Sequence, residues 1–597
     1  MQFYNILCIF FVFSLADGNN DIQENRNINV TLLANEIATW VRSGQETETF
    51  RETIQYLALP NELQLADWRT FTGLRSAGIC TVCQSVLTAF IGLRRQGMSQ
   101  ETIENSIIKL CVLLNFQTEK VCTGVVKLNA PIILHIIDSK PNLKANTICG
   151  VVLESKSCPL NDKEYEWTIP IDDIPSEEMI TKEESNETIQ IVQITDIHYD
   201  PKYEPYGNPD CGEPTCCRKG QNITNPSKKL AGFWGDYNNC DTPWHSVVDA
   251  LNHIKATHQH IDYVYFTGDI IDHGVWETSK QANMESLYKS YMKIYEVFKG
   301  IPIYPILGNH EPHPLNQFAP NSITDDSLST HWLYKMMSDL WISFGWLPES
   351  TRATILQGGF YTLSPKKGFR IIVLNSNVCY CYNWWLLYQP QDPDGQLQWL
   401  VKTLSEAEKN EELVHILSHI PPGDKSCQRT WKREYLKIVN RFSHLIAAQF
   451  NGHTHNDELQ IIYRDNSYST NASNVAWNGG SITTYSNLNP NYKVYTIDSN
   501  TLSVKDFENW MYDITSANKN PAQRPLWYRS YSFKNEYNLT DLSLNSLNDW
   551  LVEMANNADL FNRYYKNFFK HASPALKANC DLQCKKEYFN RIIVSTP

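Results

Sequence analysis

Apolar residues recur with helical spacing between Ser76 and Leu160. The i, i+3, i+4 pattern of one helix face is followed by Val86, Leu87, Phe90 and Ile91, and again by Ile103, Ile107, Leu110, Cys111 and Leu114. The pattern predicts a small all-helical domain over residues 76–160. A domain of this size buries little apolar surface, so covalent cross-links would supply much of its stability.

From Ile189 onward the pattern changes to short apolar strands that alternate with helical stretches. This alternation predicts a layered α/β domain over residues 189–505. After Asp506, stretches of helical period such as LFNRYYKNFF at 560–569 predict a helical region over residues 506–597. Residues 161–188 are acidic and contain Pro170 and Pro175, so we expect a semi-extended linker there.

The first residues have the pattern of a secretory signal peptide, which we place at residues 1–16. MQFYN precedes the apolar run ILCIFFVFSLA, which ends in small residues near Ala16. No later segment has about 18 uninterrupted apolar residues, the length that a membrane-spanning helix needs. We therefore expect a soluble protein that is secreted or lysosomal. Residues 17–75 carry no motif that indicates a role.

Composition indicates a globular protein with several domains. The 597 residues are 42% hydrophobic and 20% charged, with a formal net charge of −13. This acidity disfavours a nucleic-acid-binding protein, which normally presents a basic face. Residues 76–160 contain eight Lys and Arg against five Asp and Glu, so an attraction of this domain to anionic lipid surfaces is expected.

Cysteines and sequons fit the oxidising secretory route. Removal of Cys8 with the signal peptide leaves 15 cysteines, so one thiol should stay outside the disulfides. Five N-x-S/T sequons predict glycosylation at Asn29, Asn186, Asn222, Asn471 and Asn538.

The predicted helical domain holds six cysteines: Cys80, Cys83, Cys111, Cys122, Cys149 and Cys158. Cys80-x-x-Cys83 alone is compatible with half of a zinc site or with a redox pair, but no histidine at ligand spacing accompanies it. The whole cysteine pattern resembles the saposin family. That resemblance implies a lipid-interacting helical domain with the bridges Cys80–Cys158, Cys83–Cys149 and Cys111–Cys122. The alternative is a helical cap that only packs on its neighbour.

Five strand-like apolar runs end at residue types that bind metals. In chain order, these residues are Asp196 and His198, Asp269, Asn309, His419, and His453 with His455. Residues beyond the carboxyl ends of strands converge in open α/β sheets. One such strand end is compatible with a plain turn, because Asp, Asn and Gly favour turns. Five of them, with mixed nitrogen and oxygen ligands, indicate a centre for zinc or a similar divalent ion.

The ordered set D-x-H, G-D, G-N-H-E, H and G-H-x-H resembles the metallophosphoesterase (calcineurin-like) family. The resemblance implies a sandwich of two sheets flanked by helices, with two Zn²⁺ ions per chain. Matched position by position, it assigns Asp196, His198 and His455 to one ion, Asn309, His419 and His453 to the other, and Asp269 to both. Metal-activated water would attack phosphorus.

Two further histidines match family positions that are linked to protonation of the leaving group. His310 follows Asn309, and His273 lies four residues after Asp269 in GDIIDHG. A histidine with a pKa near 6.5 would be largely protonated in an acidic compartment, which suits a general acid. The alternative for each ring is that it only orients a ligand or a phosphate oxygen. Tyr485, in TTYSNLNP, is a candidate for cation–π contact with a choline headgroup.

With the saposin-like domain in front, the strings GDIIDHGVW, LGNHE, LSHIPPG, FNGHTHNDE and TTYSNLNP resemble the acid sphingomyelinase family from about Ser76 to the C-terminus. The resemblance implies hydrolysis of membrane sphingomyelin to ceramide and phosphocholine at acidic pH, and we expect a monomer. One alternative is a related phosphodiesterase that acts on nucleotides or other soluble phosphodiesters. Another is a lipid-transfer protein with a vestigial site.

The same resemblance implies the bridges Cys211–Cys216, Cys217–Cys240 and Cys580–Cys584. It also implies that Cys427 pairs with Cys379 or Cys381. Here the chain departs from the family, which has one cysteine in that stretch. The sequence leaves the choice between the two open.

Overall fold

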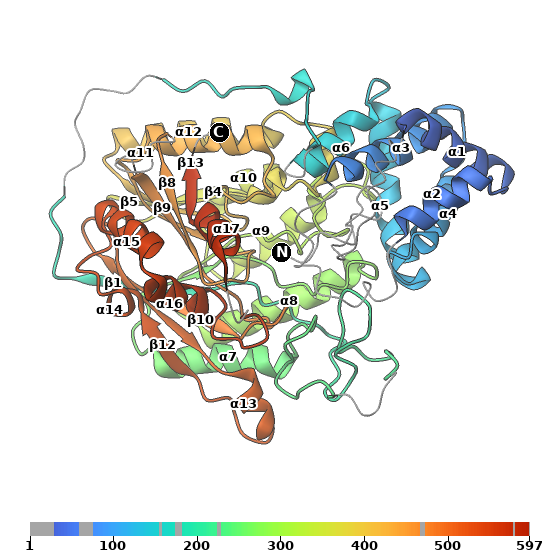
Figure 1. Ribbon diagram of the computed structural model, residues 1–597. Helices are drawn as coiled ribbons and strands as arrows, with labels where there is room; N and C mark the ends of the chain where they lie inside the picture. The colour runs from blue at the N-terminus through green and yellow to red at the C-terminus, as the bar shows by residue number, and fades with distance from the viewer. Residues whose placement is uncertain are drawn as a thin grey trace.

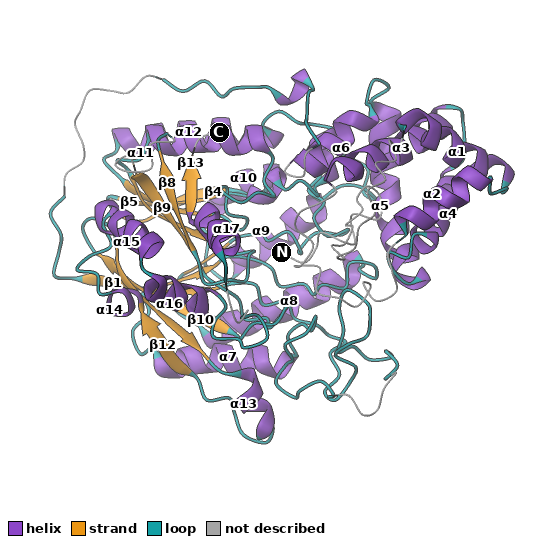
Figure 2. Ribbon diagram, in the orientation of Figure 1, coloured by secondary structure: helices purple, strands orange, loops and turns teal. Residues whose placement is uncertain are grey.

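The computed structural model describes residues 29–58, 76–154, 158–172, 182–223, 229–465, 472–576 and 580–595. The expected signal peptide and the sequon at Asn471 lie outside these residues. The strands gather on one side of the molecule, and a purely helical part lies on the other (Figures 1 and 2). The two sides correspond to the predicted α/β and helical domains.

The first sheet has the strand order β12-β11-β10-β1-β2-β3. Its parallel neighbours are β1 (Thr188–Ile194), β2 (Tyr263–Phe266) and β3 (Ile303–Pro305). Its antiparallel additions are β10 (Asn491–Asp498), β11 (Val504–Met511) and β12 (Tyr528–Ser532). Because parallel strands end at the same edge of a sheet, the segments that follow β1, β2 and β3 lie side by side.

The second sheet has the order β13-β8-β9-β7-β6-β5-β4. Its parallel centre consists of β5 (Phe369–Val373), β6 (Leu413–Leu417), β7 (Ile446–Asn451) and β9 (Ala472–Asn478). The flanking strands are β4 (Tyr361–Lys366), β8 (Leu459–Tyr463) and β13 (Ile593–Ser595). All five residues of β6 are buried, as expected of a parallel strand in a sheet that is covered on both faces.

Helices flank both sheets (Figure 2). α11 contacts β6, α12 contacts β9, and α15 and α17 contact β8. The helices of this part are α7 (Trp244–Thr257), α8 (Lys280–Val297), α9 (His331–Ser343), α10 (Arg352–Gly358), α11 (Gln396–Lys409), α12 (Arg429–Arg441), α13 (Ile514–Lys519), α14 (Phe533–Tyr537), α15 (Leu544–Asn556), α16 (Ala558–Phe568) and α17 (Leu582–Ile592). The prediction of two sheets flanked by helices is confirmed.

The boundary predicted between residues 505 and 506 does not divide the structure. It falls inside β11, and the region assigned to helices also contributes β12 and β13 to the sheets. Burial alternates from Phe507 to Met511 of β11, but residue type does not, because the polar Asn509 is one of the buried residues. The C-terminal region is therefore built into the two sheets as well as forming helices.

The helical part consists of α3 (Ser76–Arg95), α4 (Gln100–Leu113), α5 (Glu119–Ser139) and α6 (Ala145–Leu153), which we call the helical module. It contains the three bridges implied by the family resemblance, Cys80–Cys158, Cys83–Cys149 and Cys111–Cys122. Apolar side chains of α3, α4 and α5 line a cavity inside it. By length and composition α5 could cross a membrane, but 61% of its apolar stretch is buried, as in a core helix.

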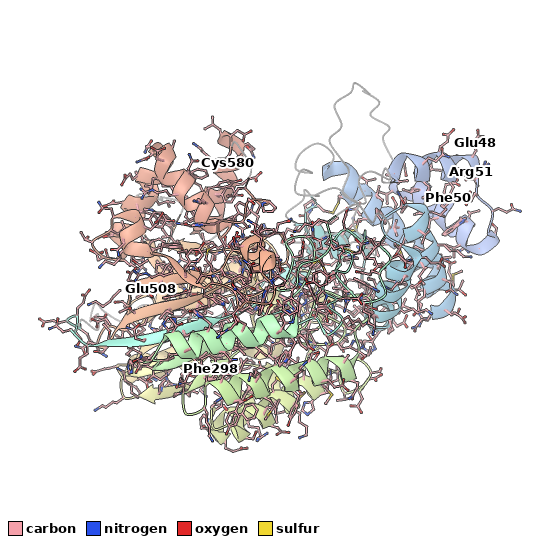
Figure 3. The ribbon with its side chains drawn as sticks, turned by 90° about the horizontal axis from the view of Figure 1, so that it is seen from below. Glu48, Phe50, Arg51, Phe298, Glu508 and Cys580 are labelled. Atoms are coloured by element: carbon pink, nitrogen blue, oxygen red, sulfur yellow. A yellow bond between two sulfur atoms is a disulfide. The ribbon has the colours of Figure 1, made fainter. Side chains whose placement is uncertain are left out.

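Two helices occupy the segment for which the sequence indicates no role. α1 (Val30–Ser43) packs on α3, and α2 (Glu48–Leu57) returns against α1. Trp40 of α1 stacks on Phe50 of α2, with ring centroids 5.2 Å apart. Figure 3 shows Phe50 and Cys580 on opposite sides of the molecule. Residues 30–57 therefore extend the helical module.

The expected linker is docked over its first part rather than semi-extended in solvent. The Tyr165 hydroxyl donates to the Leu386 carbonyl at 3.0 Å, and the Ile169 amide donates to Glu434 Oε2 at 3.0 Å. Tyr165 and Ile169 are buried. Buried residues in this acidic stretch attach it to the part of the molecule that contains the two sheets. Sequence periodicity alone does not reveal this contact.

The remaining bridges resolve the alternative at Cys427. Cys379 is its partner, while Cys381 is buried and forms no disulfide. The other implied bridges, Cys211–Cys216, Cys217–Cys240 and Cys580–Cys584, are also present. The sequons at Asn29, Asn186, Asn222 and Asn538 are exposed, as glycosylation requires.

Candidate metal centre and active site

The polar residues that follow five strands meet where the carboxyl edges of the two sheets face each other. The residues that follow β1, β2 and β3 of the first sheet, and β6 and β7 of the second, are Asp196 and His198, Asp269, Asn309, His419, and His453 with His455. All are buried except His453, which is partly exposed. Parallel strand topology thus brings together residues that are up to 259 positions apart, from 196 to 455.

Five of these residues have left-handed backbone conformations. The φ angles are 50° at Asp196, 43° at His198, 63° at Asp269, 72° at His453 and 60° at His455. Such conformations are strained by about 1–3 kcal/mol each in residues other than glycine. They turn the chain sharply at the strand ends, and their concentration in one place is typical of a functional site.

Glycines next to these residues allow the strand ends to approach closely. A Cβ atom on Gly308 would lie 2.1 Å from Asp269 Oδ1, and one on Gly452 would lie 2.3 Å from Thr195 Oγ1. Neither contact is possible for a larger residue without a shift of the loop. Close packing therefore requires glycine at the positions before Asn309 and His453.

One cluster joins the ends of β1 and β7. Nε2 of His198 lies 3.0 Å from Nε2 of His455. Asp196 Oδ1 lies 3.2 Å from the His455 nitrogen and 3.8 Å from the His198 nitrogen. Two imidazoles and one carboxylate thus point at a common position.

A second cluster joins the ends of β3, β6 and β7. Asn309 Oδ1 lies 3.0 Å from His419 Nε2 and 2.8 Å from His453 Nδ1. Asp269 lies between the two clusters, with its Oδ2 atom 3.4 Å from His198 Nε2 and 3.1 Å from His419 Nε2. One carboxylate oxygen is therefore shared by both clusters.

Backbone carbonyls set the orientation of three of the histidines. The Nδ1 atoms of His198, His419 and His455 lie 2.7, 2.7 and 2.6 Å from the carbonyl oxygens of Ile271, Thr267 and Tyr485. Each Nδ1 must therefore carry a proton and donate, which leaves Nε2 as a lone-pair donor. Metal-binding histidines are held in this way in proteins.

These contacts fit a pair of divalent ions. The Nε2 atoms of His198 and His455, 3.0 Å apart, need a proton or a metal ion between them, because two facing lone pairs would repel each other. Among the residues that the structure describes, three overlapping groups are close enough to hold metal: His198, His273 and His455; His198, Asp269 and His310; and Asp269, His419 and His453. The donors are nitrogen and oxygen atoms, which suit borderline divalent ions.

Glu311 is a buried site residue that the sequence reasoning did not assign. Its carboxylate accepts hydrogen bonds from the Gly308 and Ile270 amides, both at 2.5 Å. Burial raises the Glu311 pKa to about 7. The carboxylate joins the loops that carry Asp269 and Asn309. Glu311 is the last residue of the GNHE string, which matches the family motif. The motif therefore contains the residue but does not indicate its role.

His273 lies beside the first cluster and is held by two neighbours. Its Nδ1 lies 2.7 Å from Asp241 Oδ1, and its ring stacks on Tyr485 with centroids 3.7 Å apart. Burial raises the pKa of Asp241 well above its ordinary value and lowers that of His273. Burial therefore favours the neutral form of both members of the pair. The sequence did not reveal Asp241, which follows the disulfide-bonded Cys240 and matches no motif.

His310 lies against the same cluster. Its ring centroid is 4.6 Å from those of His198 and His273, and its amide donates to Asp269 Oδ1 at 2.8 Å. Burial lowers the pKa of His310 to about 3. Burial thus favours the neutral form of both His310 and His273, and their role as general acids stays a prediction. Desolvation outweighs the nearby carboxylates.

Tyr485 lies beside the site, but its contacts differ from those expected of a headgroup platform. One ring face is covered by His273, and its hydroxyl donates to the Pro214 carbonyl at 2.9 Å. Its side chain is 4% exposed. Tyr485 thus supports the His273 ring and, through its carbonyl, His455.

Two family models match most of the chain from β1 onward. The calcineurin-like phosphoesterase model matches residues 189–457, and the acid sphingomyelin phosphodiesterase C-terminal region matches residues 469–594. The first match contains all seven candidate metal ligands and both additional histidines. The second begins near β9 and therefore spans the boundary that we had placed at residue 505.

Relatives match over most of the chain. Sphingomyelin phosphodiesterase from Bos taurus is 35% identical, and the match covers 85% of this chain and 80% of that protein. The Homo sapiens protein of the same name is 34% identical over 85% and 79%. Sphingomyelin phosphodiesterase 1 from Caenorhabditis elegans is 32% identical over 85% and 90%. The similarity thus extends beyond the phosphoesterase core.

Proposed function

Because the chain belongs to the sphingomyelin phosphodiesterase family, we propose that it hydrolyses sphingomyelin to ceramide and phosphocholine. The observation that carries the proposal is the shared carboxylate oxygen of Asp269, which lies between two sets of metal donors. Two divalent ions held by these two sets of donors would bind a phosphodiester and activate it at the same place. The proposed setting is the secretory route and the lysosome, at acidic pH.

The proposed cofactor is two Zn²⁺ ions per chain. Asp196, His198 and His455 would hold one, Asn309, His419 and His453 the other, and Asp269 both. When bound, such ions supply Lewis acidity and a water molecule activated for attack on phosphorus. Two observations support zinc. All the donors are nitrogen or oxygen atoms, and backbone carbonyls hold the Nδ1 atoms of three of the histidines.

His310 and His273 are proposed to serve the leaving alkoxide of ceramide. Both rings lie against His198, with centroids 4.6 and 4.1 Å away. The negative phosphodiester would raise the pKa of an imidazole beside it, since an opposite charge favours the charged form. A proton can then be taken from acidic solvent after substrate binds. Asp241 holds Nδ1 of His273, so Nε2 is the atom available to donate it.

The helical module is proposed to present the lipid. Its cavity is lined only by apolar side chains, among them Phe90, Ile107 and Ile133. Val112 and Leu113, at the end of α4, are 41% and 40% exposed. Exposed apolar residues on a mildly basic domain fit an anionic bilayer. This combination favours membrane sphingolipid over soluble phosphodiesters as the substrate, with the enzyme acting as a monomer.

The test is hydrolysis of sphingomyelin in anionic liposomes beside a soluble nucleotide diester. Both assays are run at acidic and neutral pH, with zinc or with chelator. We expect chelator-sensitive release of phosphocholine, faster at acidic pH. Hydrolysis of the nucleotide diester alone would assign the soluble-substrate function. A pure, folded protein that holds no stoichiometric zinc and is inert toward both substrates would contradict the proposal.

A further inference from the structure

The helical module contacts the catalytic part, by which we mean the two sheets with their flanking helices and loops, at a glycine of α5. A Cβ atom on Gly124 would lie 2.0 Å from the carbonyl oxygen of Trp276 and 2.8 Å from its Cβ. The α5 backbone therefore lies directly against the backbone of residue 276. No other residue fits at position 124 unless the helix or the loop moves.

Trp276 belongs to the loop that carries His273. Between them the chain makes two tight turns, in which the Val275 amide donates to the His273 carbonyl at 2.9 Å and the Glu277 amide donates to the Gly274 carbonyl at 3.0 Å. A shift of residue 276 is therefore transmitted to residue 273 through a short, hydrogen-bonded stretch. His273 itself has little space, since Tyr485 is stacked on its ring.

Two cations near the Trp276 ring belong to the two sides of this contact. Lys120 of α5 lies 5.5 Å from the ring centroid. Arg218, which follows the disulfide-bonded Cys217, lies 5.7 Å from it. Buried Arg218 also pairs with Asp272 at 3.1 Å and Glu277 at 2.8 Å, which flank the turns. Residues 272–277 are thus held by the helical module and by the catalytic part together.

We propose that Gly124 and Trp276 are positioning residues for His273. The helical module, through α5, holds the 272–277 loop so that His273 keeps its contacts with Asp241 and Tyr485. The inference rests on the proposed function only in that His273 serves phosphodiester hydrolysis. It goes beyond lipid presentation, because the module then affects the chemical step with any phosphodiester, including one that never meets a membrane.

Gly124→Ala and a matched control test this contact. Gly92 lies within α3 of the same module, and a Cβ atom there would have nothing within 4 Å. Both substitutions add one methyl group inside a helix, but only Gly124→Ala pushes on Trp276. With a soluble chromogenic diester we expect kcat to fall roughly 10- to 100-fold for Gly124→Ala, the range expected for about 1 Å of misplacement. Gly92→Ala should keep the wild-type kcat, and both should keep wild-type zinc content.

A double-mutant cycle separates positioning from general damage. In a His273→Asn background, Gly124→Ala should cause no further loss of kcat, because the group that it displaces is already gone. Trp276→Phe keeps the backbone and Cβ atoms that meet Gly124 but removes the indole between Lys120 and Arg218. It should lower kcat in the same direction and serves if Gly124→Ala does not fold. Equal kcat for Gly124→Ala and Gly92→Ala would overturn the inference, as would additive losses in the cycle. A wild-type protein inert toward all phosphodiesters would instead contradict the proposed function.

Discussion

The helical module and the catalytic sheets reach a stable structure by different means. The module holds three disulfides within 79 residues, from Cys80 to Cys158, and its cavity is apolar. The sheets bury Asp196, Asp269, Glu311 and several histidines in one place, held by hydrogen bonds rather than by bridges. Buried charges need a large, preorganised surrounding, whereas a small cross-linked domain can leave apolar residues exposed.

This difference separates chemistry from lipid contact. Strained left-handed ligands are tolerated where two sheets over-determine the backbone, and exposed Val112 and Leu113 are tolerated where bridges prevent unfolding. Changes away from the contacts between the two regions, such as Gly124–Trp276 and Asn129–Trp384, should therefore affect one region alone. The following predictions sharpen or break this comparison, beginning with the largest effect.

Asp269→Asn should abolish activity and metal binding together. The substitution removes the charge of the oxygen shared by the two clusters. Losses in metal affinity should exceed the roughly 10- to 100-fold that changes around metal ligands produce. Zinc content by mass spectrometry and diester hydrolysis check both. The module should keep its stability, and an Asp269→Asn protein with full zinc would refute the assignment.

His310→Gln should keep the zinc and lose mainly kcat. Loss of a proton donor at the leaving oxygen typically lowers the rate by about 10²–10⁴-fold. The His310 amide, which donates to Asp269 Oδ1, is unaffected by the substitution. Steady-state kinetics with zinc analysis make the measurement. Zinc loss equal to that of Asp269→Asn would show that the two residues do not have separate roles.

His415 should make the sheet core less stable in acid. Its Nε2 donates to the Leu502 carbonyl and its Nδ1 accepts from the Tyr265 hydroxyl, both at 2.7 Å, so the buried ring is neutral. Burial lowers its pKa to about 4. Because the folded state binds this proton more weakly than the unfolded state, where the pKa is about 6.5, its stability is complete above about pH 6.5 and falls as the pH drops toward 4. The loss is of order 3 kcal/mol.

Urea unfolding at about pH 7 and pH 4 measures this loss in the wild type and in His415→Gln. The variant should show a smaller difference between the two pH values, since it has no ring to protonate. A pH dependence identical to that of the wild type would mean that other groups account for it.

Val112→Ser with Leu113→Ser should affect the module alone. Both residues are exposed, so folding should change little, while binding to a bilayer loses apolar burial. We expect hydrolysis of liposomal sphingomyelin to fall about tenfold and the soluble diester to be turned over as before. This double substitution is a cleaner test than deletion of residues 76–160, because Asn129 and His135 of α5 contact the buried Trp384 and Trp385, which the deletion would expose. Parallel loss on both substrates would argue against membrane contact by this tip.

The sequence predicted the candidate metal ligands because each of them directly follows a recognisable apolar run. An apolar strand followed by Asp, Asn or His is readable within about ten residues, and the order of five such ends is specific. Asp241 was missed because its role depends on His273, 32 positions away, and not on its own surroundings. The docking of Tyr165 on Leu386 was missed for the same reason, across 221 positions. The boundary at residue 505 was wrong because the β11 sequence VKDFENWM does not alternate between apolar and polar residues, so the strand gives no periodic signal.

The sequence by itself determined the α/β core, the helical module, and the residues whose chemistry fits two ions. Periodicity and turn residues act over short distances, so they can be read from the chain. Tertiary structure alone decided that Cys379 rather than Cys381 joins Cys427, that Asp241 contacts His273, and that Gly124 meets Trp276. These outcomes depend on burial and on close packing between distant segments, and both exist only once the chain has folded.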